Sequence, residues 1–222
     1  MKSDTDTSYT LKLLPFKKCR ALGHDDPIRF YYWPVIGKLY RRRVEICLSE
    51  CRGGERILEV GFGSGVTFLN LHERYREIHG LDMKESIRNV YPVFTSAHIA
   101  TYLLNGDVMH MPYMNDVFDT VLLISVLEHL RPEKQLQAFS EIRRVLKPGG
   151  QVVYGVPVER PLMVWMFRIL GYNIRKLHYS TEKDVLQAAG SIFERVSVLQ
   201  MKSFCSGLGY IYEVGHFVKC QS

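Results

Sequence analysis

Short apolar runs alternate with amphipathic segments through the middle of the chain. Five of these runs have the length and composition of strands, at residues 55–60, 77–83, 101–107, 118–125 and 151–157. The fourth run, FDTVLLIS, is apolar almost throughout. Such continuity is typical of parallel strands that are buried on both faces.

Helical patterns separate the predicted strands. A helix is expected after Gly65, and another from Lys84. A third begins near Pro132, a residue that suits the first turn of a helix, and is expected to end at residues 147–150, KPGG. Its apolar stripe consists of Leu136, Phe139, Ile142, Val145 and Leu146. Alternating strands and helices predict an α/β fold with a doubly wound, mostly parallel sheet.

The leading segment differs from this pattern. Residues 1–25 show no clear period, which suggests a loose or wrapping arm, and residues 28–51 suggest one or two helices. We therefore predict an N-terminal arm and helical lid over residues 1–52 and a single α/β domain over residues 53–222. Within that domain, residues 158–180 are expected to form a cap insertion.

A glycine-rich turn follows the first predicted strand, in the stretch ILEVGFGSGVTFL at residues 57–69. Gly61, Gly63 and Gly65 alternate with other residues. A turn of this kind presents backbone N–H groups to a ligand at the carboxyl edge of the sheet. The dinucleotide fingerprint has the spacing G-x-G-x-x-G, so the alternating spacing counts against a nicotinamide-dependent dehydrogenase.

Two acidic residues follow later strands. Asp82 ends the second predicted strand and could accept hydrogen bonds from both hydroxyls of a ribose. Asp107, in an Asn-Gly-Asp turn after the third strand, could bind the edge of an adenine. For both carboxylates a structural role, such as capping the next helix, stays open.

Four motifs taken together resemble a known family. The segments LEVGFGSG, HGLDM, NGDVMHMPYMNDVFDTVLLISVLEHL and EIRRVLKPGG, in this order, are similar to class I S-adenosylmethionine-dependent methyltransferases of the small-molecule and quinone-type branch. The similarity covers residues 56–156. It implies a Rossmann-like sheet of seven strands with the last antiparallel, residues 191–200 and 210–219 supplying strands six and seven. It also implies S-adenosylmethionine as cofactor and S-adenosylhomocysteine as product.

The same resemblance assigns expected roles around the cofactor. The glycine turn would hold the methionine portion, with Glu59 near its amino group. Asp82 would bind the ribose, and Met83 would cover one face of the adenine. The remaining residues with implied roles are Asp107 and Val108 at the adenine edge, and Ile124 and Ser125 beneath the sulfonium.

Methyl transfer from a sulfonium depends mainly on positioning, and a general base is needed only when the acceptor must lose a proton. His129 follows the fourth strand directly, and His178 lies in a short stretch similar to that branch, so both are candidate catalytic residues. A histidine in a polar network at a helix start is the alternative for His129, and Glu128 is equally ambiguous. Because only Glu128 lies near Ser125 at the strand end, no metal site is expected.

The acceptor is expected to be a small or lipid-like molecule. Tyr31, Tyr32 and Trp33 either pack in the core or line the acceptor pocket as part of a lid. The apolar segment at residues 158–176 either packs on the domain, caps the pocket, or touches a membrane surface through its apolar and basic side chains. A peripheral membrane contact therefore stays open.

Composition restricts the remaining choices. The chain has 222 residues, with 46% hydrophobic and 23% charged residues, and no apolar run near the roughly 18 residues that span a bilayer. Its polar start and five cysteines without a Cys-x-x-Cys pair favour a cytoplasmic protein with reduced thiols.

Basic charge is concentrated at the start of the chain. Of the net charge of +6, residues 1–52 carry +5, from 11 Lys and Arg against 6 Asp and Glu. This excess is either a solvated helix face or a contact with an anionic lipid, nucleic acid or acidic partner. The absence of an RNA-binding signature argues against nucleic acid. The alternative function is a non-catalytic S-adenosylmethionine-binding or RNA-associated regulatory module.

Overall fold

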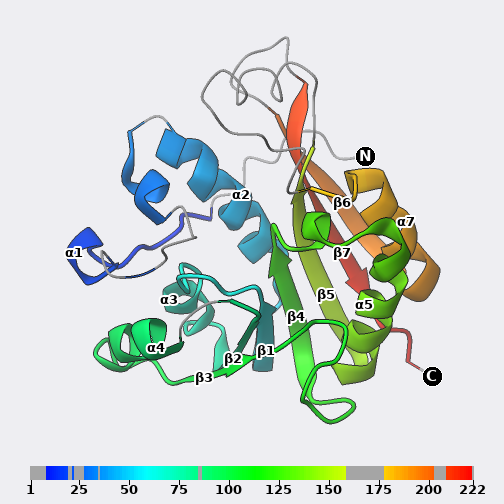
Figure 1. The fold of residues 1–222 in the computed structure, drawn as a ribbon, viewed down its shortest axis with the longest axis horizontal. Helices are drawn as coiled ribbons and strands as arrows, with labels where there is room; N and C mark the ends of the chain where they lie inside the picture. The colour runs from blue at the N-terminus through cyan, green and yellow to red at the C-terminus, as the bar shows by residue number, and fades with distance from the viewer. Residues whose placement is uncertain are drawn as a thin grey trace.

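A seven-stranded sheet forms the centre of the molecule (Figure 1). The computed structural model describes residues 9–19, 22, 28–34, 36–84, 87–158, 178–202 and 209–221. The strand order is β3-β2-β1-β4-β5-β7-β6, with β7 antiparallel to both of its neighbours and all other pairs parallel. The strands are β1 (Gly54–Val60), β2 (Tyr75–Asp82), β3 (Thr101–Asn105), β4 (Phe118–Ile124), β5 (Leu146–Pro157), β6 (Glu194–Lys202) and β7 (Tyr210–Val218). This architecture confirms the predicted doubly wound fold.

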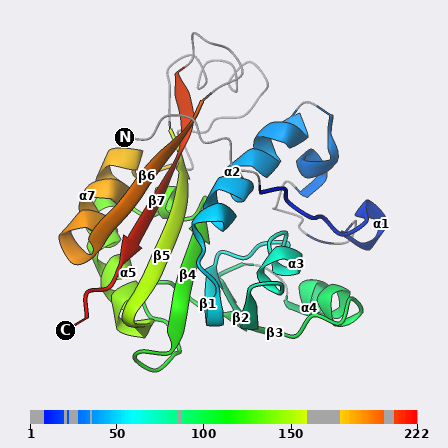
Figure 2. The same ribbon diagram turned by 180° about the vertical axis from the view of Figure 1, so that it is seen from behind.

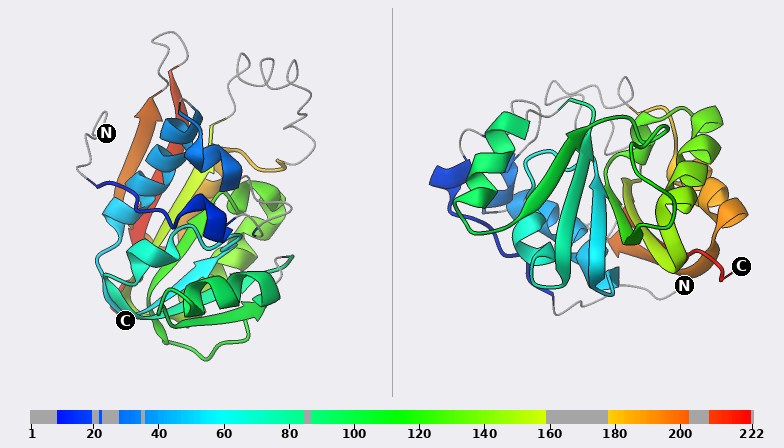
Figure 3. Two further views of the ribbon diagram at one scale, coloured as in Figure 1. Left: turned by 90° about the vertical axis from the view of Figure 1, so that its left-hand side faces the viewer. Right: turned by 90° about the horizontal axis from the view of Figure 1, so that it is seen from below.

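Helices cover both faces of this sheet (Figures 2 and 3). They are α1 (Phe16–Cys19), η1 (Ile28–Tyr32), α2 (Ile36–Glu50), α3 (Phe68–Leu71), α4 (Ile87–Thr95), η2 (Leu127–His129), α5 (Pro132–Val145) and α7 (Glu182–Ile192). Among the helices of the described residues, none is long and apolar enough to cross a membrane.

The alternation of side chains along each strand divides the core into two clusters. In β4, Leu122 packs with the cluster that contains the N-terminal helices α2, η1, α3 and α4. Its neighbours Val121 and Leu123 point the other way, into the cluster of α5 and α7. Both clusters are fully buried around β4, as the continuous apolar run predicted.

The predicted end and apolar stripe of the third helix are wrong. The third predicted helix, α5, ends at Val145, and residues 147–150 already belong to β5. Leu146 fits the helical period but pairs with Phe118 of β4 as a strand residue, and Leu136 is 52% exposed. The helix expected after the glycine turn is present as α3, a single turn of four residues.

The chain before α2 packs along the domain. The backbone N–H of Leu11 donates to Glu45 Oε1 at 3.0 Å. The backbone N–H of Lys12 donates to Asn70 Oδ1, and Asn70 Nδ2 donates back to the Lys12 carbonyl, each at 2.9 Å. Asn70 is fully buried in α3, so these bonds hold residues 9–15 against the core. The boundary predicted at residue 52 stays a prediction, as does the cap insertion, of which residues 159–177 lie outside the described chain.

Helix α2 connects distant parts of the sheet. Its last residue, Glu50, accepts a hydrogen bond from Ser197 Oγ of β6 at 2.6 Å, and the same oxygen lies 3.1 Å from His216 Nδ1 of β7. Cys47 on this helix and Cys51 just after it are buried free thiols, and burial raises the pKa of both. Helix α2 is therefore an integral part of the domain core.

Candidate functional site

The glycine turn after β1 adopts a backbone that other residues rarely take. Gly61, Gly63 and Gly65 have φ angles of 71°, 50° and 69°. A Cβ on Gly61 would lie 2.3 Å from Val126 Cγ2, and one on Gly65 would lie 2.7 Å from the Phe68 ring. Glycine is therefore required both by the left-handed backbone and by close packing, of Gly61 on the segment after β4 and of Gly65 on α3.

Carboxylates lie below and beside this turn. Glu59 of β1 is buried and accepts a hydrogen bond from the Thr67 hydroxyl. Asp82, at the end of β2, accepts hydrogen bonds from the backbone N–H of Gly63 at 3.1 Å and of Lys84 at 2.9 Å. A carboxylate can accept about four hydrogen bonds, so holding the turn is compatible with binding a ribose. The next side chain, Met83, is 67% exposed.

The loop after β3 lies next to the end of β2. The backbone N–H of Gly106 donates to the Asp82 carbonyl at 3.0 Å. Asp107 Oδ1 accepts a hydrogen bond from the Met109 N–H at 2.9 Å, while the Val108 side chain is buried in the core. The structure therefore brings Asp82, Asp107 and Val108 to one edge of the sheet, as the sequence predicted.

The end of β4 is strained. Ser125, directly after Ile124, is a non-glycine residue with a φ angle of 57°, in the left-handed region. Its N–H donates to the Gly155 carbonyl at 2.8 Å, and its Oγ lies 3.0 Å from the hydroxyl of Tyr212. Such backbone strain concentrates at functional sites, where surrounding contacts maintain it.

Helix α2 places a guanidinium over this strand end. Arg43 Nη2 donates to the Tyr31 hydroxyl at 3.2 Å, and Nη1 lies 3.5 Å from Ser125 Oγ. The guanidinium also stacks over the Tyr40 ring, 4.3 Å from its centroid. Arg43 Nε is buried without a hydrogen-bond acceptor, and no ion pair among the described residues includes Arg43.

The three adjacent aromatic residues of the leading segment point to different places. Tyr31 is buried beside Arg43. The Tyr32 hydroxyl donates to the Leu14 carbonyl at 2.5 Å, and its ring lines a cavity between the arm and the glycine turn. Trp33 is 49% exposed and packs edge-on against Phe30. Of the three, Tyr31 is the one that the structure places beside the end of β4.

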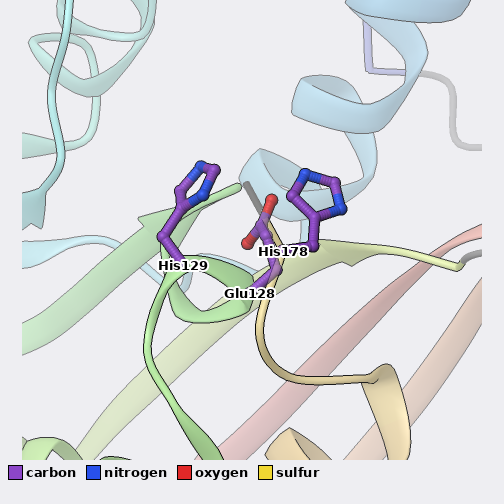
Figure 4. A group of neighbouring side chains, drawn as sticks. All are labelled: Glu128, His129 and His178. Carbon is purple, nitrogen blue, oxygen red and sulfur yellow. The ribbon is translucent and has the colours of Figure 1, made fainter. Parts of the chain in front are cut away.

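Beyond Ser125 the chain forms a cluster of titratable side chains (Figure 4). Glu128, on η2, is 3% exposed, and its Oε2 has no hydrogen-bond partner. Burial raises the pKa of Glu128 to about 8, although a hydrogen bond from its own backbone N–H and the charge of Arg43 oppose this rise. The exposed His129 ring and the half-buried His178 ring lie 5.4 Å apart.

Backbone hydrogen bonds position His178 beside Glu128. The N–H groups of Tyr179 and Ser180 donate to the Glu128 carbonyl at 2.8 and 3.3 Å. Ser180 Oγ donates to the Leu130 carbonyl at 2.6 Å, and Thr181 then starts α7 with a capping box. The segments 128–130 and 178–180, far apart in the sequence, are thus joined by hydrogen bonds.

Sequence reasoning missed Arg43 and Tyr212 as parts of this site. Arg43 stands in a run of three arginines, and only the packing of α2 distinguishes it from its neighbours. Tyr212 lies on the last strand, which the topology brings beside β5. Arg43 could be found only from the packing of α2 on the sheet, and Tyr212 only from the order of the strands.

Comparison with known proteins gives consistent results. Residues 58–154 match the family model described as a methyltransferase domain. The chain is 27% identical to a demethylmenaquinone methyltransferase of Staphylococcus aureus strain JH9 over 183 residues, 78% of this chain and 75% of that protein.

Solved structures show the same fold. The N-methyltransferase NodS from Bradyrhizobium japonicum WM9, in complex with S-adenosyl-L-homocysteine, has a TM-score of 0.64 at 17% identity and covers 92% of this chain and 97% of its own. The [4+2]-cyclase SpnF has a TM-score of 0.68 at 16% identity, covering 90% and 86%. Since two different activities share this fold, these structural similarities establish the architecture alone.

Proposed function

We propose that the chain is a class I S-adenosylmethionine-dependent methyltransferase that transfers the methyl group to a small or lipid-like acceptor bound at the end of β4. The observation that carries this proposal is the position of Tyr31 and Arg43 beside Ser125. They come from η1 and α2, so the N-terminal helices form a wall over the strand end at which the acceptor must arrive.

The residues present fit the cofactor. Gly61, Gly63 and Gly65 allow a ligand to approach the backbone of the turn closely, and the buried carboxylate of Glu59 suits an ammonium group. Asp82 and Met83 would hold the ribose and one face of the adenine, and Asp107 with Val108 would hold its edge. When bound, S-adenosylmethionine supplies an electrophilic methyl group, which would lie above Ile124 and Ser125.

The side chains beside the end of β4 favour an apolar, ring-containing acceptor. Tyr31 and Tyr40 present aromatic surface around the Arg43 guanidinium, which can stabilise negative charge on an acceptor oxygen. A relative is named for demethylmenaquinone, which is consistent with an acceptor of this kind. Tyr32 and Trp33 would contribute to the same lid from farther away, and residues 158–180 would cover the pocket or contact a membrane surface.

Catalysis would rest mainly on positioning. His129 and His178 flank Glu128 next to the strand end, so they are the candidate catalytic side chains. An imidazole at this position can take the proton that a hydroxyl or amine acceptor loses on methylation. A carbon acceptor activated as an enolate would instead need the charge of Arg43.

The experiment is a methyl-transfer assay with labelled S-adenosylmethionine. The purified protein is incubated in parallel with demethylmenaquinone and related quinols, fatty acids, small amines, and total RNA. Label in an apolar small molecule is the expected result. Label in RNA, or binding of S-adenosylhomocysteine with no transfer to any acceptor, would contradict the proposal and support the regulatory alternative.

A further inference from the structure

Glu128, His129 and His178 bring one carboxylate oxygen and two imidazole nitrogens within 4.8 Å of one another. Figure 4 shows the carboxylate between the two imidazoles. We propose that these three side chains bind a divalent transition-metal ion, with Zn²⁺ as the best fit. The sequence alone favoured no metal, because the distance from Glu128 to His178 depends on the fold.

The donor set selects the class of ion. Two imidazole nitrogens and one carboxylate oxygen form the protein ligand set of many catalytic zinc sites, whereas Mg²⁺ and Ca²⁺ prefer oxygen ligands alone. Zinc–ligand bonds of about 2.0–2.2 Å put two ligand atoms of a tetrahedral site roughly 3.3 Å apart. The remaining difference would have to be closed by rotation of side chains, of which His129 is the exposed one.

An unsatisfied buried atom points to the same ligand. Glu128 is 3% exposed, and its Oε2 has no hydrogen-bond partner. A buried acceptor without a partner has lost its hydrogen bonds to water without compensation. A cation between the two imidazoles would coordinate this oxygen and compensate for that loss.

The backbone around the cluster is already fixed. The Glu128 carbonyl accepts hydrogen bonds from Tyr179 and Ser180, which immediately follow His178. On the other side, Gln135 Nε2 donates to the Leu127 carbonyl at 2.6 Å and holds η2 in place. The ligand-bearing segments are therefore preorganised, as metal sites require.

The positive charge of Arg43 influences which acceptor group would bind at the ion. Arg43 is the cation of α2 that faces Glu128, and its hydrogen bonds go to Tyr31 and Ser125. The single negative charge of Glu128 does not balance the positive charges of a divalent ion and of Arg43. The site would therefore remain positively charged and favour an anionic acceptor oxygen. This second step rests on the proposed function. Imidazoles that coordinate an ion cannot take a proton from the acceptor, so in the metal-bound protein the ion would promote loss of that proton by lowering the pKa of a coordinated hydroxyl.

The test is equilibrium dialysis of the full chain against Zn²⁺, followed by metal analysis. One ion per chain is expected, with affinity reduced more than about tenfold in His129→Ala, His178→Ala and Glu128→Gln. His72→Ala, which removes an exposed imidazole elsewhere, serves as the matched control, and circular dichroism checks folding of each variant. Bound Co²⁺ should show visible absorption bands that the two histidine variants lose.

Equal zinc binding by the wild type and the folded His129→Ala and His178→Ala variants would overturn the metal site. Loss of binding in His72→Ala alone would overturn it as well. Calorimetry with S-adenosylhomocysteine tests the cofactor site separately, because Asp82 and the glycine turn do not belong to the metal cluster. If zinc binds with one ion per chain and a chelator leaves methyl transfer unchanged, the acceptor step is wrong while the proposed function stands.

Discussion

Asp82 and Gly63 are joined by a hydrogen bond of 3.1 Å, from the backbone N–H of Gly63 to Asp82 Oδ2. The end of β2 therefore holds the glycine turn that follows β1. One carboxylate contributes both to the shape of the turn and, by our assignment, to ribose binding. Substitutions at Asp82 should affect cofactor affinity through both routes.

Asp82→Ala should weaken binding of S-adenosylhomocysteine by about 1–3 kcal/mol, the usual cost of losing hydrogen bonds to a charged group. At about 1.4 kcal/mol per factor of ten, this is a loss of roughly five- to 150-fold, measurable by calorimetry. Glu133→Ala, in the exposed first turn of α5, is the control. An unchanged dissociation constant for Asp82→Ala would remove Asp82 from the cofactor site.

Gly61→Ala should destabilise the fold. The new Cβ would meet Val126 Cγ2 at 2.3 Å and sit at a φ of 71°, costing about 1–3 kcal/mol for each effect. The double variant Gly61→Ala/Val126→Ala should relieve the clash but not the backbone strain. Urea unfolding of Gly61→Ala, Val126→Ala and the double variant checks this. A double variant that loses as much stability as the two single variants combined would contradict the packing argument.

Arg43→Met should raise the KM for the acceptor while leaving the affinity for S-adenosylhomocysteine unchanged. The reason is that Arg43 contacts Tyr31 and Ser125 on the acceptor side of β4 and has no contact with the glycine turn. Steady-state kinetics of Arg43→Met beside Arg41→Met, whose Nε binds the Gly37 carbonyl, provides the comparison. An equal effect in both variants would speak against a specific role.

Asp119→Asn should lower stability at neutral pH by about 1–3 kcal/mol. Asp119 accepts hydrogen bonds from the N–H groups of Glu55 and Arg56, at 3.0 and 2.8 Å, and from Lys147 Nζ at 2.6 Å. Burial raises the pKa of Asp119, but the Lys147 and backbone hydrogen bonds outweigh burial and lower it below its usual value.

Because the pKa of Asp119 is lower in the folded than in the unfolded state, its contribution is present above about pH 4 and is lost as the pH falls through the folded value. The stability difference between wild type and Asp119→Asn should therefore shrink as the pH falls from 7 to 3. Urea unfolding at several pH values measures this difference. A difference that stays constant across this range would show that the ionised carboxylate is not responsible.

Much of the fold follows from local pattern. The run around Leu122 is apolar because both faces of β4 are covered, and the glycines are required by the turn itself, so both signals are visible in sequence. Leu146 was assigned to a helix because it continues the 3.6-residue period, and only its pairing with Phe118 makes it a strand residue. The Arg43–Ser125 and Glu128–His178 contacts depend on tertiary packing, which no local pattern contains.

The contact of Glu50 with Ser197 and His216 has a consequence for biosynthesis. Helix α2 leaves the ribosome early, yet the strands that bind its last residue are near the C-terminal end of the chain. The part of this helix that contacts β6 and β7 must therefore stay uncovered, or be sheltered by a chaperone, until these strands have been translated. Contacts between such distant segments slow folding and prolong exposure to aggregation. A chain that stops before β7 would keep its catalytic motifs and still lack part of the surface on which its first long helix docks.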